Sequence, residues 1–212
     1  RPRRARPPPR GGQTRRTAYY NAWEKFGYAK RERLVDDIRA ARDQQDKAKQ
    51  QFVSALEQFK AVTKFSGGDL EKAYDKLNAE YKRSEGQAEA VKDRIATVKN
   101  VAKALFAEWN EEIGQIKDDP SLQAQSRQLY DRTKSSYEQL IGRMDAAAGS
   151  MDPVLTKFRN RVLFLKANLN AQAIGSLSGM EAELSTDIDR LVKEMERSIA
   201  EADAFIAAQG RK

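Results

Sequence analysis

Apolar residues recur in alternating steps of four and three along the stretch from Leu70 to Ile116. The positions with this spacing are Leu70, Tyr74, Leu77, Tyr81, Ser84, Ala88, Val91, Ile95, Val98, Ala102, Leu105, Trp109, Glu112 and Ile116. Only Ser84 and Glu112 interrupt the apolar line. Such a heptad spacing places one apolar stripe along a helix, and a partner helix must cover that stripe. The pattern therefore predicts one long helix within a bundle.

Three further stretches carry helical spacing and are predicted to pack against the first. They cover about residues 17–62, 120–169 and 179–209. The seam of the first is Leu34, Ile38, Ala41, Gln45, Ala48, Phe52, Ala55, Phe59 and Val62. The seam of the second is Leu122, Leu129, Leu140, Met144, Ala147, Met151, Leu155, Phe158, Val162, Leu165 and Leu169. Gly67 should end the helix before it, with Asp69 as the N-cap of the next one. Asp119 can cap the third stretch, with Pro120 at its first helical position. The apolar seam of the third stretch continues past Pro153, which favours one long kinked helix over two separate ones.

The end of the chain is predicted to form a turn followed by a shorter helix. The turn runs over residues 175–179, and Ser178 with Glu181 fits a capping box. The seam of the last helix is Leu184, Ile188, Leu191, Met195, Ile199, Ala202 and Phe205. Because short turns make neighbouring helices antiparallel, the short last helix can cover only half of the others.

The expected fold is all-α, an elongated antiparallel coiled-coil-like bundle of three to four long helices. At 1.5 Å per residue the rod should be about 70 Å long, with four helices at one end and three at the other. Folding the first helix onto the second places Trp23 level with Trp109. It also predicts a narrow waist of small layers, in which Ala41, Gln45 and Ala48 face Val91, Ala88 and Ser84.

Aromatic residues gather at the predicted three-helix end and form a candidate interaction surface. They are Tyr19, Tyr20, Trp23, Phe26, Phe106, Trp109 and Tyr130. Two interpretations remain open. The rings can fill a core that lacks its fourth helix, or their exposed remainder can form a surface for a protein partner, for self-association or for a membrane.

The formal net charge of +8 belongs to the first residues of the chain. The candidate basic arm consists of Arg1, Arg3, Arg4, Arg6, Arg10, Arg15 and Arg16, and without it 32 basic and 31 acidic residues remain. Residues 1–17 are predicted to be a disordered Arg/Pro-rich tail, and residues 18–209 a single helical bundle. The tail is either a basic arm for phosphate or anionic lipid, or a segment foreign to the protein.

The residues offer little chemistry. The chain has no Cys and no His, which removes thiolate nucleophiles, imidazole bases and the usual zinc ligands. A phosphate loop, a nucleophile elbow and a metal-ligand spacing are also missing. We therefore predict no catalytic, cofactor-binding or metal-binding residues, and no enzyme activity. Two amides near the end of the third helix, Asn168 and Asn170, are expected to bond each other, a turn backbone or water.

Several stretches resemble an uncharacterised bacterial family known as domain of unknown function 2959. They are YYNAWEKFG from Tyr19, and later FSGGDLEKAYDKLN, ALFAEW, MDPVL and VLFLKANLNAQAI. The resemblance covers about residues 18–208. It implies a Gram-negative envelope protein that usually begins with a signal peptide and often carries a lipidated Cys just ahead of the Tyr pair. This chain has Arg15-Arg16-Thr17 there, and no functional residue of the family can be carried over.

We therefore expect a non-enzymatic helical rod of the cell envelope, in the periplasm or attached to the outer membrane, that serves as a spacer, scaffold or partner-binding module. One alternative is a peripheral bundle that associates with or shapes a membrane. That role needs basic residues on one face, and the balanced charge of the body argues against it. Another alternative is binding of an anionic polymer such as nucleic acid through the Arg arm, which would be salt-sensitive and lost on deletion of residues 1–16.

Overall fold

The computed structural model describes the backbone of residues 12–209 and the side chains of residues 30–209. This part of the chain forms five helices: α1 (Gly12–Thr63), α2 (Leu70–Gln115), α3 (Pro120–Ala167), α4 (Ala171–Gly179) and α5 (Glu181–Gln209). It contains no strand, so the predicted all-α class is confirmed. α1, α2 and α3 have 52, 46 and 48 residues, and α5 has 29.

At the two loops between the long helices, one helix ends and the next begins as predicted. Gly67 and Gly68 adopt φ angles of 152° and 112°, a region that L side chains avoid. The side chain of Asp69 then accepts a hydrogen bond from the backbone N–H of Lys72 and caps α2. Asp119 does the same for α3 by accepting from Leu122, with Pro120 as the first helical residue.

α3 runs without a break past Pro153, as predicted. A proline inside a helix has no N–H to donate, so the carbonyl of Gly149 loses its helical partner. The residues on both sides of Gly149 and Pro153 stay helical. The buried apolar stripe continues through Met151 and Val154 into the second half of the helix. One long helix therefore connects the two ends of the molecule.

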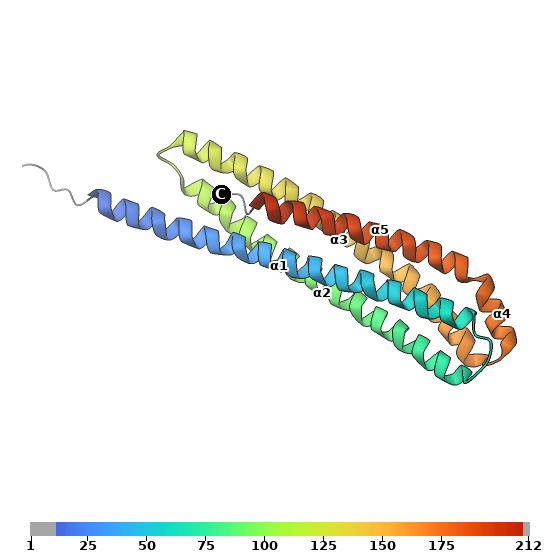
Figure 1. Ribbon diagram of the computed structural model, residues 1–212. Coiled ribbons are helices and arrows are strands. Elements are labelled where there is room, and N and C mark those ends of the chain that lie inside the picture. The colour runs from blue at the N-terminus through green and yellow to red at the C-terminus, as the bar shows by residue number, and fades with distance from the viewer. Residues whose placement is uncertain (1–11, 210–212) are drawn as a thin grey trace, which may run out of the picture.

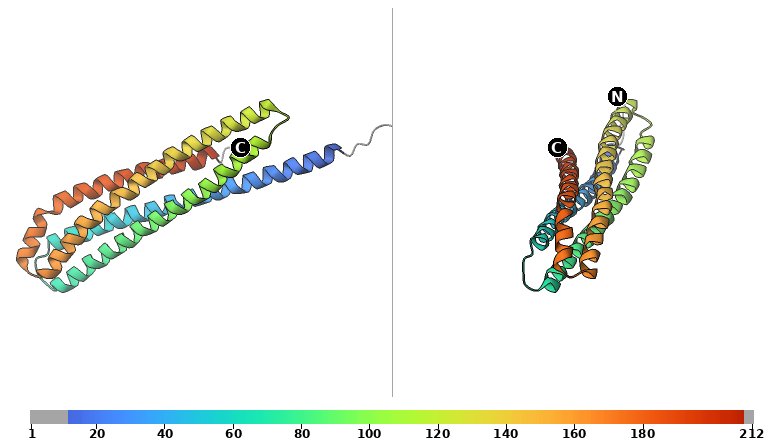
Figure 2. Two further views of the ribbon diagram at one scale, coloured as in Figure 1. Left: turned by 180° about the vertical axis from the view of Figure 1, so that it is seen from behind. Right: turned by 90° about the vertical axis from the view of Figure 1, so that its right-hand side faces the viewer.

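The long helices lie side by side in an elongated bundle. α1 packs against α2 and α5, and α3 packs against the same two helices from the other side. The views of Figures 1 and 2 agree that α4 lies across one tip of the bundle, and that α5 ends well short of the loop joining α2 to α3. Near that loop the first turns of α1 diverge from the α2–α3 hairpin (Figure 2, left).

The predicted seams of α1 and α2 form the core. Every seam residue of α1 from Leu34 to Val62 is buried, and so is every seam residue of α2 from Leu77 to Trp109. The predicted seam position Glu112 is wrong, because Ile113, with 2% of its surface exposed, is buried in its place. From Leu105, two successive steps of four residues lead to Trp109 and Ile113, because a helix of 3.6 residues per turn drifts away from a strict heptad repeat.

The middle of the bundle has the register expected from the sequence. Gln44 Nε2 donates to Gln87 Oε1 at 2.6 Å, and Gln51 Nε2 donates to Glu80 Oε2 at 2.5 Å. The small seam residues of both helices at this level are almost completely buried. α5 joins this layer, because Ser198 Oγ donates to Gln45 Oε1 at 2.9 Å. Ser198, and not the predicted Ile199, occupies the seam of α5.

The predicted turn over residues 175–179 is helical and belongs to α4. Asn170 Oδ1 accepts from the N–H of Ala173 at 2.9 Å and so caps α4, while Asn168 Nδ2 donates to the carbonyl of Phe164. Ala173, Ile174 and Leu177 are buried, and this helical spacing outweighs the glycines nearby. Ser178 is therefore not a cap, and its hydroxyl donates to the carbonyl of Thr63 at 2.9 Å.

Three predicted seam residues of α3 and its end are exposed: Leu122, Leu129 and Leu169, at 45%, 49% and 44%. The first three buried positions of α3 are Tyr130, Thr133 and Tyr137, so the buried stripe begins one residue away from the predicted Leu129. α1 begins at Gly12, so the predicted boundary at residue 17 lies inside this helix. Residues 1–11 and 210–212 lie outside the part of the chain that the structure describes.

Candidate functional site

Four aromatic rings pack together near the α2–α3 loop, at what we call the aromatic end. Phe106 lies between the others, with its ring centroid 5.4 Å from Tyr137, 5.7 Å from Tyr130 and 6.4 Å from Trp109. The rings of Trp109 and Tyr130 meet edge to face at 5.5 Å. α2 and α3 each supply two of the rings at helical spacing, so the cluster joins the two arms of the hairpin.

Cations lie against the faces of these rings. The guanidinium of Arg31 lies 4.3 Å from the centroid of Trp109, and Arg127 and Lys134 lie 5.3 and 5.8 Å from that of Tyr130. Such contacts contribute about 0.5–1 kcal/mol each at exposed sites. Burial lowers the pKa of Arg31, and the charge of Glu112 raises it back in part. α1 is thereby tied to the hairpin by a cation on a ring.

The structure brings Phe106, Trp109 and Tyr130 together, as expected, but leaves 6–8% of each exposed. Their burial favours the interpretation in which the rings fill a core. Trp109 is covered by Arg31 of α1. The predicted pairing of Trp109 with Trp23 lies outside the described side chains, which begin at Lys30.

The other predicted site residues cannot be placed in the same way. The side chains of Tyr19, Tyr20, Trp23 and Phe26 lie outside the described side chains, although the backbone of these residues is helical. The side chains of the candidate basic arm also lie outside the described side chains. Arg15 and Arg16 belong to α1 by their backbone, and the remaining arginines lie before the described residues.

Sequence reasoning missed Tyr137 and the cations. Tyr130 and Tyr137 stand one heptad apart, with Lys134 four residues after the first, and this spacing was a usable signal. Arg31 could not be found in this way, because its position on Trp109 depends on a register shift between α1 and α2 towards the aromatic end.

A groove with a volume of about 470 Å³ runs between α2 and α3 beside the rings. It is lined by Lys99, Lys103, Phe106, Ala107, Asn110, Tyr130, Lys134, Tyr137 and Glu138. Burial, followed by the charges of Asp145 and Glu138, raises the pKa of Tyr137 to about 12. The phenol of Tyr137 therefore remains a neutral hydrogen-bond donor at physiological pH.

Ion pairs occupy part of the rim of this groove. Lys99 Nζ lies 2.7 Å from Asp145 Oδ1, while Lys134 Nζ and Glu138 Oε1 are 4.0 Å apart. Arg127 Nη1 donates to Asn110 Oδ1 at 2.7 Å, and the amide nitrogen of Asn110 makes no hydrogen bond within residues 30–209. The rim thus combines ammonium, phenol and amide donors around an aromatic floor.

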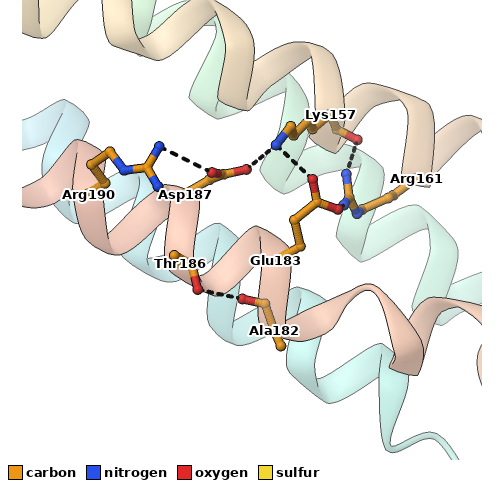
Figure 3. Close-up of polar contacts among 7 residues, drawn as sticks. All are labelled: Lys157, Arg161, Ala182, Glu183, Thr186, Asp187 and Arg190. Atoms are coloured by element: carbon orange, nitrogen blue, oxygen red, sulfur yellow. Dashed lines mark hydrogen bonds and ion pairs between the residues drawn. The ribbon is translucent and has the colours of Figure 1, made fainter.

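A second polar cluster fastens α5 to α3 in the other half of the molecule (Figure 3). Lys157 Nζ donates to Glu183 Oε1 at 2.7 Å and to Asp187 Oδ2 at 2.5 Å. Arg161 Nη2 donates to Glu183 Oε2 at 2.8 Å, and its Nη1 donates to the carbonyl of Lys157 at 3.0 Å. We call these four residues the α3–α5 clamp.

The charges of the clamp satisfy one another. The hydrogen bonds to Asp187 and Glu183 raise the pKa of Lys157, and the bond from Lys157 lowers the pKa of Glu183. Both residues keep their charges over the physiological range, and neither offers an acid or base poised for proton transfer. The clamp therefore acts as a structural tie that holds α5 in place.

Among the side chains of residues 30–209, no group of three or more acidic residues could hold a metal ion. No helix within residues 12–209 is both long and apolar enough to cross a membrane.

One comparison with known proteins gave a match. A family model described as a protein of unknown function (DUF2959) matches residues 19–209, which is nearly the whole chain. No curated protein and no solved structure matches the chain.

Proposed function

The chain belongs to this family of proteins of unknown function, and from that premise we propose that it is a non-enzymatic helical rod of the bacterial cell envelope. In this proposal the rod is a structural spacer or scaffold that binds a partner at one end. Its mechanism is geometric, because it depends on a fixed length and on two chemically different ends.

One observation carries the proposal: the buried seam of α2 is continuous from Leu77 to Ile113. This seam extends for about 54 Å at 1.5 Å per residue. α1 and α3 cover it along this length, so the three long helices cannot bend independently without exposing apolar surface. A body of this kind holds its two ends at a constant separation.

The two ends differ in composition and number of helices. In the proposed arrangement the bundle has four helices at the α4 tip and three at the aromatic end, because α5 stops at Gln209. The ring cluster at the aromatic end is built by α2 and α3, with Arg31 contributed by α1. The aromatic end lacks a covering fourth helix, which makes it the end proposed to bind a partner, either another protein or a second copy of the chain.

The envelope location rests on the family resemblance, which implies a periplasmic or outer-membrane-attached protein. We would test it by intact mass and N-terminal sequencing of the protein purified from its native cells. A mature start near Tyr19, with added lipid mass on an upstream Cys, supports the location. An unmodified start at or before Arg1 contradicts the lipid attachment.

Photo-crosslinking in the native cells tests the functional proposal. A photoreactive amino acid would replace Lys117 in the α2–α3 loop, Gln172 in the α4 tip or Glu89 on the exposed middle of α2. A partner-binding module predicts specific adducts at Lys117, and a spacer predicts different adducts at Lys117 and Gln172. The absence of adducts at both ends, or the same adducts at Glu89, contradicts the proposal.

Membrane association is a second candidate, favoured by one observation at the α4 tip. Leu163, Phe164, Leu169 and Met180 are exposed apolar residues at the end of α3 and on either side of α4. Co-sedimentation of the full chain with anionic liposomes tests this role, with Leu163→Ser/Phe164→Ser as the matched variant. Equal sedimentation of both proteins contradicts insertion of these side chains.

A further inference from the structure

We propose that the groove between α2 and α3 at the aromatic end binds an acidic peptide segment of a partner protein. The inference rests on the proposed function, in which this end binds a partner, and it names the chemistry of that partner. The groove offers donors of three kinds, an aromatic floor and a surplus of positive charge, and each of these points to the same ligand.

The polar groups of the groove are donors with few acceptors among them. Lys99, Lys103 and Lys134 bring ammonium groups, while Tyr130 and Tyr137 bring phenols. Neither phenol makes a hydrogen bond to any residue that the structure describes, and neither oxygen is enclosed by the protein. Carboxylates accept hydrogen bonds from both kinds of donor, and charge-assisted bonds are the stronger ones.

The charge of the groove favours an anionic ligand. Three lysines and one acid, Glu138, line it, and Asp145 beside it pairs with Lys99 at 2.7 Å, which leaves one positive charge in excess. Lys103 is exposed and makes no ion pair within residues 30–209. Lys134 lies 4.0 Å from Glu138, which is a loose pair that a ligand carboxylate can replace.

The length of the groove fits a peptide better than a single anion. Lys99 and Asn110 stand eleven residues apart on α2, or about 16 Å at 1.5 Å per residue. An extended chain covers this distance with about five residues. The carboxylate of Glu138 in the lining disfavours a uniform polyanion such as nucleic acid.

The floor explains why apolar residues should alternate with the acids. Phe106, Tyr130 and Tyr137 line the groove with 7–8% of each residue exposed, and the neighbouring Ala107 is exposed. An extended peptide points successive side chains to opposite sides, so apolar side chains can pack on the floor while carboxylates reach the lysines on the rim.

The test is an NMR titration of the ¹⁵N-labelled full chain with an octapeptide of alternating glutamate and leucine. Matched titrations use the same peptide with glutamine in place of glutamate, a thymidine octanucleotide and inorganic phosphate. We expect shift changes confined to residues 99–110 and 130–138, and an affinity at least about tenfold higher than for the glutamine peptide. Tighter binding of the oligonucleotide or of phosphate overturns the proposal, and so does the absence of localised shifts up to about 5 mM peptide.

Charge reversal provides the matched variants. Lys103→Glu/Lys134→Glu should weaken binding of the glutamate peptide at least about tenfold. Lys82→Glu/Lys166→Glu changes the charge equally at exposed positions of the same two helices outside the groove, and should change the affinity less than about twofold. Equal losses in both variants contradict a site in the groove.

The outcomes separate this inference from the proposed function. If the peptide fails to bind while adducts at Lys117 persist in cells, the partner is not acidic but the binding end stands. If the peptide binds in the groove while no adduct forms at either end of the rod, the groove stands and the proposed function fails.

Discussion

Replacement of Phe106 by alanine should weaken the aromatic end selectively. The ring of Phe106 is the centre of the cluster, contacts three other rings at centroid distances of 5.4–6.4 Å and is only 7% exposed. Its loss removes contacts that join the two arms of the α2–α3 hairpin.

The expected cost follows from the burial of the ring. Truncation of a buried Phe to Ala costs about 3–5 kcal/mol, which combines the lost transfer free energy with the cavity left behind. With a slope of about 2 kcal/mol per molar urea, the unfolding midpoint should fall by about 1.5–2.5 M. Leu129→Ala on the same end of α3 is the control, because this side chain is exposed and should cost less than about 0.5 kcal/mol.

The assay uses the placement of the two tryptophans. Trp23 and Trp109 both belong to the half of the rod that contains the aromatic end, so their fluorescence reports on that half, while far-UV circular dichroism reports on all helices. Phe106→Ala should lower the fluorescence midpoint more than the dichroism midpoint. Phe158→Ala, in the other half, removes a fully buried ring beside Phe59 and Tyr81 and should have the opposite order of effects.

A fluorescence midpoint lowered by less than about 0.3 M in Phe106→Ala would show that the ring contributes little to packing, contrary to this prediction. Identical shifts of fluorescence and dichroism in both variants would also contradict it. The rod would then unfold as a single unit, without an end that can loosen separately.

Three further predictions concern the polar residues. The pKa of Tyr137 is raised to about 12, so its burial stabilises the fold fully below pH 10, and this stability is lost as the pH rises from 10 to 12. Urea melts at pH 9 and 11 should show this loss, which is at most about 2 kcal/mol after solvent screening, and Tyr137→Phe should abolish it. The pKa of Glu183 is lowered from 4.5, so the clamp contributes fully to stability above pH 4.5, and this contribution weakens as the pH falls below that value. In Glu183→Gln the melting temperature should therefore fall less steeply on the acid side, and an unchanged pH profile would contradict the clamp. Ser198→Ala leaves Gln45 buried without its partner and should lower the free energy of unfolding by about 1–3 kcal/mol. The double variant Gln45→Leu/Ser198→Ala should lie within about 1 kcal/mol of the original chain, and equal losses in both variants would contradict a stabilising bond between Ser198 and Gln45.

The seams of α1 and α2 could be predicted from the sequence because each is a long, regular repeat with a clear start and stop. The caps at Asp69 and Asp119 followed from local chemistry alone, since one side chain and one backbone N–H decide them. α4 was missed because Gly175 and Gly179 weaken a helix of nine residues, and its stability comes from packing that the sequence does not display. Ser178 and Glu181 had the capping-box spacing, yet both bond Thr63 at the end of α1.

The candidate site was harder to predict than the fold. The gathering of Phe106, Trp109 and Tyr130 follows from the hairpin topology, since antiparallel helices bring the end of one to the start of the next. Which face of α3 points inward could not be decided, because Leu129 and Tyr130 are neighbours and both suit a seam. The position of Arg31 on Trp109 depends on side-chain packing between α1 and α2, which no local pattern encodes.

The central claim is that the molecule is a rigid rod of fixed length, and one distance tests it directly. The chain has no native Cys, so spin labels can be attached to single cysteines introduced at Lys117 and Gln172, at opposite ends of α3. Double electron–electron resonance on the full chain should give one narrow distribution near about 70 Å, the length of this helix at 1.5 Å per residue. A broad distribution, or a main distance below about 50 Å, would contradict a rod of fixed length.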